Sequence, residues 1–120
     1  MSKKHTILYV DDETINLMLF ESMFNDKYNV LTAESGAQGL ELLKDNYVDM
    51  VFSDMKMPEM NGLEFICYAK EQFPNIVYFI LSGFDITDEI QEALNNKLVN
   101  KYFQKPFDMQ EIEACITEML

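Results

Sequence analysis

The chain has no arginine and no tryptophan, and its 120 residues include only 1 histidine, 2 cysteines, 3 prolines and 4 glycines. With 9 basic residues against 21 acidic ones, the formal net charge is −12. Binding to a nucleic-acid backbone depends on clusters of cationic side chains, so this balance argues against direct nucleic-acid binding. Cys67 and Cys115 lie far apart in helix-like segments, and we expect small buried thiols rather than a metal pair or a disulfide.

Long hydrophobic runs are missing as well. No apolar stretch approaches the ~18 residues that cross a bilayer, and the first residues lead into a short strand without the apolar region of a signal peptide. We therefore expect a cytoplasmic protein. Apolar residues make up 48% and charged residues 25% of the chain, the usual mixture of a soluble globular domain. The length suits one domain with its own core, so residues 1–120 are predicted to form a single domain.

The sequence does contain five strand-like segments, each followed by a helix-like segment. The strands are predicted at residues 6–10, 28–33, 50–54, 76–81 and 102–103. Thr14 is expected to cap the first helix, and Asp108 with Glu111 the last. The helix faces expected to point inward are Ile15, Leu19 and Met23; Ala37, Leu40 and Leu43; Leu63, Ile66 and Cys67; Ile86, Ile90, Ala93 and Leu94; and Met109, Ile112, Ile116 and Met119. This order predicts an α/β fold, with a parallel sheet covered by helices on both faces.

Polar side chains collect where these predicted strands end. Asp11 and Asp12 follow the first strand, Asp54 ends the third, Ser82 follows the fourth and Lys105 follows the fifth. The carboxyl ends of parallel strands meet at one edge of the sheet, where ligands bind in open α/β folds. Carboxylates converging there need a cation, and Mg²⁺ suits them because it prefers hard oxygen ligands. An aspartate beside Mg²⁺ and a lysine is suited to accept a phosphoryl group.

Each of these residues also has an ordinary structural explanation. Asp11 and Asp12 could favour a helix N-terminus through its dipole. Ser82 could be a turn residue, Tyr102 a core residue, and Lys105 a surface lysine whose stem lies along apolar groups. All of these explanations would have to coincide at one edge of one sheet, which favours a phosphoacceptor site.

Four motifs in this order resemble the response regulator receiver domain. They are VDDE at residues 10–13, SDMKMPEMNG at 53–62, LSG at 81–83 and YFQKPF at 102–107, and the resemblance extends over the whole chain. It implies a flavodoxin-like, doubly wound sheet of five parallel strands in the order 2-1-3-4-5, with five helices on two faces. It also implies a regulatory phosphoacceptor rather than an enzyme, with only self-phosphotransfer and slow autodephosphorylation.

The resemblance assigns roles to individual residues. Asp54 would accept the phosphoryl group. Mg²⁺, or alternatively Mn²⁺, would be held by Asp12 directly, by Asp11 mainly through water, by Asp54 and by the backbone carbonyl of Lys56. Further roles fall to Lys105 and Ser82, which would bind phosphoryl oxygens, to Ser82 and Tyr102 as switch residues, and to a cis peptide between Lys105 and Pro106. Lys56 and Phe84 would tune dephosphorylation, and we hypothesise that the bulky Phe84 restricts the attacking water.

The implied partners are a sensor histidine kinase or a histidine phosphotransfer protein, because the single histidine, His5, lies in the N-terminal tail. We expect no output domain in this chain, which would make it either a stand-alone regulator that acts by protein contact or a receiver cut from a longer protein. A downstream protein or a second copy would bind the face formed by the fourth helix, the fifth strand and the fifth helix. The sequence departs from the family pattern at Leu98-Val99, where a small Gly-Ala pair is common. Asn95-Asn96 is expected to supply the left-handed turn there.

Three other functions fit the sequence less well. A degenerate receiver that acts only by protein binding lacks support, because every acceptor-site position holds a competent residue. An aspartyl-phosphate hydrolase of the haloacid dehalogenase type needs a second acid where Lys56 stands. A flavodoxin-like flavin carrier needs a Ser/Thr/Gly-rich phosphate loop after the first strand, and the acidic residues there would repel the flavin phosphate.

Overall fold

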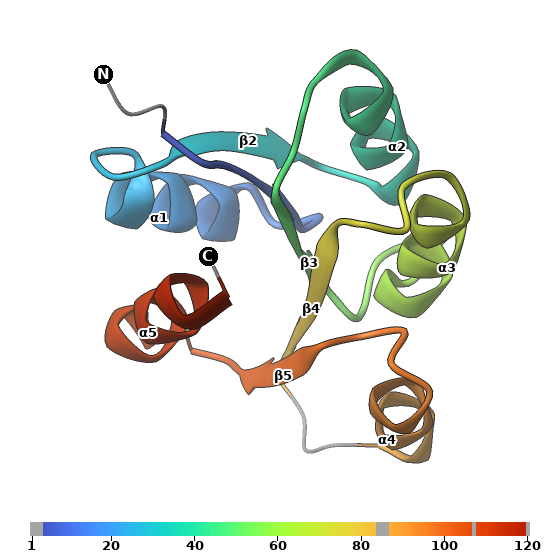
Figure 1. The fold of residues 1–120 in the computed structure, drawn as a ribbon. Coiled ribbons are helices and arrows are strands. Elements are labelled where there is room, and N and C mark those ends of the chain that lie inside the picture. Colours follow the sequence, from blue (N-terminus) through green and yellow to red (C-terminus); the bar gives the residue numbers. More distant parts are fainter. Residues whose placement is uncertain (1–3, 84–86, 107, 120) are drawn as a thin grey trace.

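The protein alternates strands and helices along its whole length (Figure 1). The structure is a computed structural model that describes residues 4–83, 87–106 and 108–119. The elements are β1 (Thr6–Val10), α1 (Thr14–Phe24), β2 (Asn29–Ala33), α2 (Gly36–Asp45), β3 (Met50–Asp54), α3 (Gly62–Gln72), β4 (Val77–Ser82), α4 (Asp88–Asn95), β5 (Lys101–Gln104) and α5 (Met109–Met119). Among the described residues, no helix has the length and apolar character needed to span a membrane.

The five strands form one parallel sheet in the order β2-β1-β3-β4-β5, which confirms the predicted fold. Helices α1 and α5 cover one face, and α2, α3 and α4 cover the other (Figure 1). The chain starts at β1, adds β2 on one side and then crosses to add β3 on the other. Such a reversal of strand order leaves a crevice at the carboxyl ends of β1 and β3, which is where ligands bind in open sheets.

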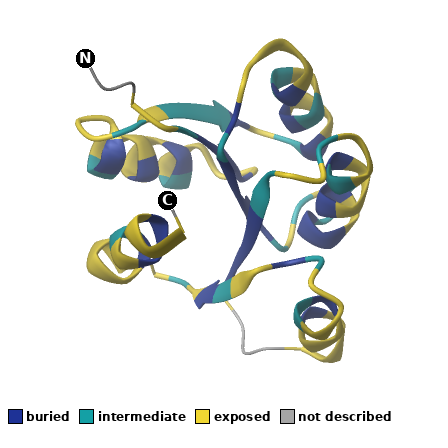
Figure 2. Ribbon diagram, in the orientation of Figure 1, coloured by how far each residue is buried: buried dark blue, intermediate teal, exposed yellow. Residues whose placement is uncertain are grey.

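The core has two layers, one on each face of the sheet, and the inner strands β1, β3 and β4 between them are the most buried part of the chain (Figure 2). The layer under α2, α3 and α4 is mainly aliphatic. The layer under α1 and α5 is rich in aromatic rings: Tyr9, Phe20, Phe24, Phe52, Phe79 and Phe103. Strands β3 and β4 are interior and almost wholly buried, as expected for strands covered on both faces.

Helix α1 packs by a different face from the one that the sequence predicted. The buried residues are Leu17, Phe20 and Phe24, whereas Ile15 is 70% and Leu19 is 47% exposed. The helix carries apolar side chains around most of its circumference, so periodicity could not decide which ones face the sheet. The aromatic rings do so because they stack in the aromatic layer; Phe20, for example, lies 4.5 Å from Tyr9 between ring centroids.

Smaller predictions need correction too. The first helix has its N-cap at Glu13, without a side-chain capping bond, so Thr14 is not the cap. Ala37 and Cys67 are exposed, because buried glycines and larger apolar residues take the inner faces of α2 and α3. The left-handed residue after α4 is Lys97 (φ 63°), while Asn96 has φ −85°.

The ends of α3 and α5 have clear local causes, and the Asp108 cap of the last helix matches the sequence prediction. Asn61 forms a capping box with Glu64 at the start of α3, and that helix ends at Gln72, before Pro74. Asp108 Oδ1 accepts the amide hydrogens of Gln110 and Glu111 at the start of α5. The ends of the final helical stripe, Met109 and Met119, are 38% and 42% exposed, so only its middle is buried. Ile86 lies outside the described residues.

Candidate functional site

The polar residues predicted to meet at one edge of the sheet do lie together there, at the carboxyl ends of strands β1, β3, β4 and β5. Asp54 and Ser82 are the last residues of β3 and β4, while Asp11 and Lys105 directly follow β1 and β5. Backbone bonds fix these ends to one another, since the Lys105 amide donates to the Ser82 carbonyl at 2.8 Å. Asp11 is fully buried, and Asp54 and Ser82 are 6% and 3% exposed.

Three carboxylates form an acidic cluster at this edge. Asp11, Asp12 and Asp54 each offer a carboxylate oxygen, and these atoms lie within 4.8 Å of one another. Two of the three side chains are buried, and Asp12 is exposed. Oxygen donors of this kind and number, open to water on one side, suit a small divalent cation such as Mg²⁺, which keeps part of its hydration shell.

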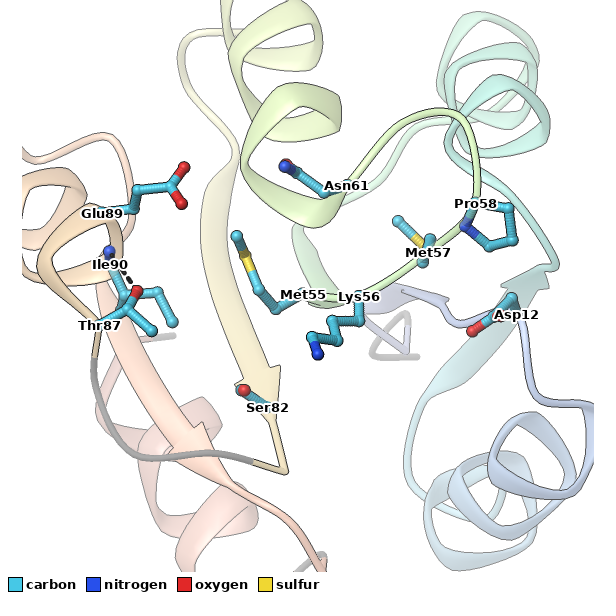
Figure 3. A pocket seen from close by; sticks show the side chains of 10 residues that line it. All are labelled: Asp12, Met55, Lys56, Met57, Pro58, Asn61, Ser82, Thr87, Glu89 and Ile90. Atoms are coloured by element: carbon cyan, nitrogen blue, oxygen red, sulfur yellow. Dashed lines mark hydrogen bonds between the residues drawn. The ribbon is translucent and has the colours of Figure 1, made fainter.

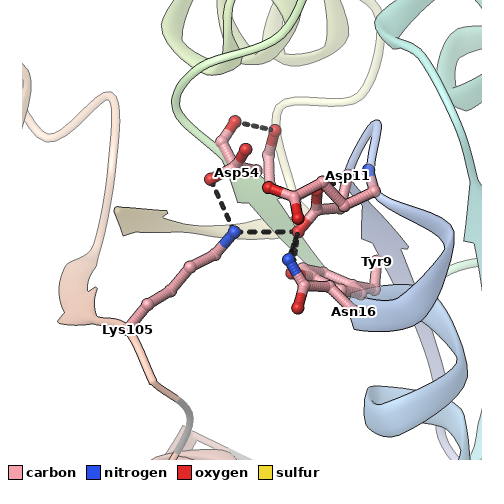
Figure 4. A network of polar contacts seen from close by, with 7 residues as sticks. Tyr9, Asp11, Asn16, Asp54 and Lys105 are labelled. Carbon is pink, nitrogen blue, oxygen red and sulfur yellow. Dashed lines mark hydrogen bonds and ion pairs between the residues drawn. The ribbon is translucent and has the colours of Figure 1, made fainter. Parts of the chain in front are cut away.

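Lys105 compensates part of this negative charge (Figure 4). Its Nζ lies 2.9 Å from Asp11 Oδ2 and 3.0 Å from Asp54 Oδ1, so one ammonium group bridges two carboxylates. The peptide between Lys105 and Pro106 is cis, as predicted. Burial would lower the pKa of Lys105, but its hydrogen bonds to Asp11 and Asp54 and their charges outweigh burial and raise that pKa. The lysine therefore stays charged at neutral pH.

Asp54 is a carboxylate in an unfavourable place. Burial raises its pKa to about 6, with nearby Asp11 and Asp12 adding to the rise and Lys105 opposing it. At neutral pH the side chain is mainly ionised and can act as a nucleophile, but the charge is poorly solvated. A cation or a covalent modification at this carboxylate would relieve that cost.

Asp11 is surrounded by hydrogen-bond donors from its own chain. Its Oδ2 accepts from the Tyr9 hydroxyl, from Asn16 Nδ2 at 3.2 Å and from Lys105, and its Oδ1 accepts from the Glu13 amide at 2.9 Å. With its oxygens occupied in this way, Asp11 is better placed to meet a cation through water than directly. Tyr9 and Asn16 were not predicted as site residues. Their spacing from Asp11, two residues before and five after, was the available signal.

The loop from β3 to α3 approaches Asp54 closely. A Cβ atom at Gly62 would collide with the backbone carbonyl oxygen of Asp54 and would lie 2.9 Å from Ile80 Cδ1. The Gly62 amide also donates to the Met55 carbonyl at 2.8 Å. Only glycine fits here, because the first turn of α3 packs directly on the end of β3.

A cleft of about 740 Å³ opens beside the acidic cluster, between the β3–α3 loop and α4 (Figure 3). Its lining residues are Asp12, Met55, Lys56, Met57, Pro58, Asn61, Ser82, Thr87, Glu89 and Ile90. The side chain of Lys56 is exposed at its rim, and Ser82 lies at its floor. The cleft opens to solvent next to the carboxyl ends of β3 and β4.

Tyr102 is half-buried on β5 and packs against the aliphatic layer. It is paired in register with Ile80 on β4, two residues before Ser82. The serine and the tyrosine thus lie on neighbouring strands, two residues apart in register. Phe84, predicted to tune dephosphorylation, lies outside the described residues, and that role stays a prediction.

The response regulator receiver domain family matches residues 7–117, nearly the whole chain. The chain belongs to this family. Receiver domains are the regulatory modules of two-component signalling, so a regulatory role in such a system follows. The acidic cluster, the lysine and the serine described above lie where the four family-like motifs predicted them.

Individual relatives are of two lengths. Sporulation initiation phosphotransferase F of Bacillus subtilis (strain 168) is 33% identical, with 95% of this chain and 92% of that protein covered. The hydrogenase transcriptional regulatory protein HoxA of Cupriavidus necator is 30% identical over 88% of this chain, which spans only 22% of that longer protein. Among solved structures, the signal receiver domain of an HD domain-containing protein from Pseudomonas fluorescens Pf-5 has a TM-score of 0.90 at 26% identity, with 97% of this chain and 94% of that one covered.

Proposed function

We propose that Asp54 accepts a phosphoryl group from a phosphohistidine donor and thereby switches a protein-interaction surface. The observation that carries this proposal is the single ammonium group of Lys105 bridging Asp11 and Asp54, within a cluster of three carboxylates. Such a site is short of positive charge until a cation is bound, and that cation would also neutralise the charge of an incoming phosphoryl group. An Asp54 oxygen forms the new bond to phosphorus, and the bond from phosphorus to the histidine nitrogen breaks with its electron pair left on nitrogen.

Asp12 and Asp54 would hold Mg²⁺ directly, Asp11 would hold it through water, and the Lys56 carbonyl is the further ligand that the family resemblance supplies. When bound, the cation neutralises charge on the phosphoryl oxygens during transfer. Lys105 provides the second positive charge, and it can follow the phosphoryl group because its long stem carries the ammonium. Ser82 lines the cleft and would donate to a phosphoryl oxygen.

The donor would approach over an apolar surface on α1, defined by Ile15, Met18 and Leu19. These side chains are 70%, 64% and 47% exposed, and large exposed apolar side chains gathered on one helix mark a contact surface. A hollow lined by Asn16, Leu19, Met23, Lys105 and Pro106 joins this α1 surface to the site. A partner helix that covers the α1 surface would bring its histidine over the end of β3.

The output would run from Ser82 to Tyr102. If Ser82 moves toward the phosphoryl group, the space that it leaves adjoins the neighbouring strand, and the half-buried Tyr102 can turn inward. The face formed by α4, β5 and α5 changes as a result, and a downstream protein or a second copy of the chain would bind there. We also expect the protein to act in the cytoplasm, where sensor kinases present their phosphohistidines.

The test is incubation with Mg²⁺ and acetyl phosphate, followed by intact-mass measurement, because the chain has no tryptophan for a quenching assay. We expect a phosphoryl mass shift in the parent and in Asp49→Asn, a matched change just before the same strand, and no shift in Asp54→Asn. Failure of the parent to gain mass with acetyl phosphate, and also with a phosphorylated histidine phosphotransfer protein, would favour the degenerate receiver instead.

A further inference from the structure

Tyr9 lies in a row of buried aromatic side chains on the face of the sheet under α1 and α5. It is in register with Phe52 on β3, which is in register with Phe79 on β4, and all three are fully buried. A phenylalanine at position 9 would fill the same space without a polar atom. A buried hydroxyl without a hydrogen bond destabilises the fold, so its presence here calls for a specific partner.

That partner is Asp11. Residues two apart on a strand point to the same face, so the side chain of Tyr9 extends beneath that of Asp11. The Tyr9 hydroxyl donates to Asp11 Oδ2 (Figure 4). An ionised carboxylate oxygen only accepts hydrogen bonds, so the buried phenol is the donor of this pair.

The donors to Asp11 Oδ2 differ in how firmly they are held. Lys105 is shared, since its Nζ is 2.9 Å from Asp11 and 3.0 Å from Asp54, and in the proposed reaction it follows the phosphoryl group. Tyr9 is fixed, because its ring is fully buried and stacks on Phe20 at 4.5 Å between centroids with 23° between the planes. When Lys105 moves, Tyr9 remains in place below the carboxylate.

We propose that Tyr9 is a positioning residue of the cation site, whose hydroxyl holds Asp11 Oδ2 at the base of the acidic cluster. Asp11 then keeps one orientation whether or not Lys105 is bound to it, and it meets the cation through an ordered water. The site becomes rigid and small, as Mg²⁺ requires, rather than adaptable, as Ca²⁺ tolerates. This inference deepens the proposed function and rests on it, since it assumes that the acidic cluster binds a divalent cation.

The experiment compares Tyr9→Phe with Tyr78→Phe in the full chain. Tyr78 is a matched control: it is also fully buried, on β4, and its hydroxyl donates to the Phe73 carbonyl at 2.9 Å, away from the acidic cluster. Mg²⁺ and Ca²⁺ dissociation constants are measured for each protein by calorimetric titration. Thermal unfolding without metal reports the loss of a buried hydrogen bond, which both variants share.

We expect Tyr9→Phe to weaken Mg²⁺ binding about tenfold, the scale found when a group that supports a metal ligand is removed, and to weaken Ca²⁺ binding less. Tyr78→Phe should bind both cations as the parent does. Unchanged or tighter Mg²⁺ binding in Tyr9→Phe, an equal loss for the two cations, or an equal loss in Tyr78→Phe would each overturn the positioning role. Cation binding is measured without any phosphodonor, so a parent that binds Mg²⁺ but takes no phosphoryl group would refute the proposed function and leave this test intact.

Discussion

Asp49 and Asp54 lie at opposite ends of β3, and their surroundings differ. Asp49, just before the strand, accepts the Thr6 amide at 2.9 Å on Oδ2, and His5 Nδ1 lies 3.5 Å from the same oxygen. Asp54, at the far end, is paired with a lysine that it shares with another carboxylate. An acid at the start of a strand can thus satisfy local backbone donors, whereas one at the end of the strand can be left with a deficit of positive charge. This deficit of positive charge distinguishes the candidate site at Asp54 from the other end of the strand.

The largest expected effect comes from removing Lys105, the lysine that pairs with Asp54 and directly follows β5. Lys101, at the other end of β5, provides the control. Lys105→Ala removes the charge that would accompany the phosphoryl group, and we expect the rate of phosphorylation by acetyl phosphate to fall about a hundredfold or more. Lys101→Ala, at the exposed start of the same strand, should leave the rate unchanged. The measurement is the initial rate of mass gain at saturating Mg²⁺. Equal rates in the two variants would contradict the role of Lys105.

A second effect is on stability and depends on pH. The pKa of Asp54 is raised to about 6 in the folded protein, above ~3.9 in an unfolded chain. The folded, metal-free protein therefore binds a proton that the unfolded chain has released, and its stability falls as the pH rises through this window. Between about pH 4 and about pH 8 the loss is on the order of 2 kcal/mol.

Asp54→Asn removes that contribution, so its unfolding free energy should exceed the parent's by an amount that grows from pH 4 to pH 8. Urea unfolding at several pH values in the presence of a chelator measures the difference. Asp49→Asn provides the matched control from the other end of β3. A difference between Asp54→Asn and the parent that shrinks as the pH rises would show the sign to be wrong.

The α1 surface supplies a smaller effect, restricted to protein donors. Ile15→Ala should slow transfer from a phosphorylated histidine phosphotransfer protein about tenfold, the loss expected on truncating an important contact residue, while phosphorylation by acetyl phosphate continues at the parent rate. Tyr47→Ala tests the opposite end of the molecule, where Tyr47 is 83% exposed before β3. If Tyr47→Ala slows protein-donor transfer and Ile15→Ala does not, the donor binds elsewhere.

The smallest expected effect is a loss of stability on replacing Asp49, just before β3. Asp49→Ala leaves the Thr6 amide without its side-chain acceptor, which should lower the unfolding free energy by about 1 kcal/mol. The Mg²⁺ affinity and the phosphorylation rate should match those of the parent. Chemical unfolding and calorimetric titration provide the two measurements, and a loss of Mg²⁺ affinity would mean that the two ends of the strand are coupled.

The sequence predicted the sheet and its order well because parallel strands buried on both faces have a strong and local signal. Apolar runs such as the one ending at Asp54 stop abruptly, and their carboxyl ends must meet at one edge. The prediction for α1 was wrong because Ile15 and Leu19 have the spacing typical of a buried helix face, but their side chains are exposed. Periodicity reports that a face is apolar and not what covers it.

Within the site, the residues that carry charge could be predicted and the residues that orient them could not. Asp54 and Lys105 stand out because charges at the ends of buried strands are unusual. In the sequence, Tyr9 looks like any other residue of a buried strand. Only the folded structure shows that its hydroxyl donates to Asp11. The left-handed turn at Lys97 was missed for a similar reason, since a lysine at positive φ is set by the surrounding fold and not by its own preference.

The close packing of Gly62 on Asp54 also bears on how such a protein can diversify. Position 62 admits no side chain, whereas Lys56, Pro58 and Glu59 in the same loop are exposed. Mutations that accumulate over generations can therefore alter the rim of the cleft, and with it the choice of partner, while the acceptor keeps its place. A lineage of duplicated regulators would be able to separate its signalling pathways through that rim without rebuilding the chemistry beneath it.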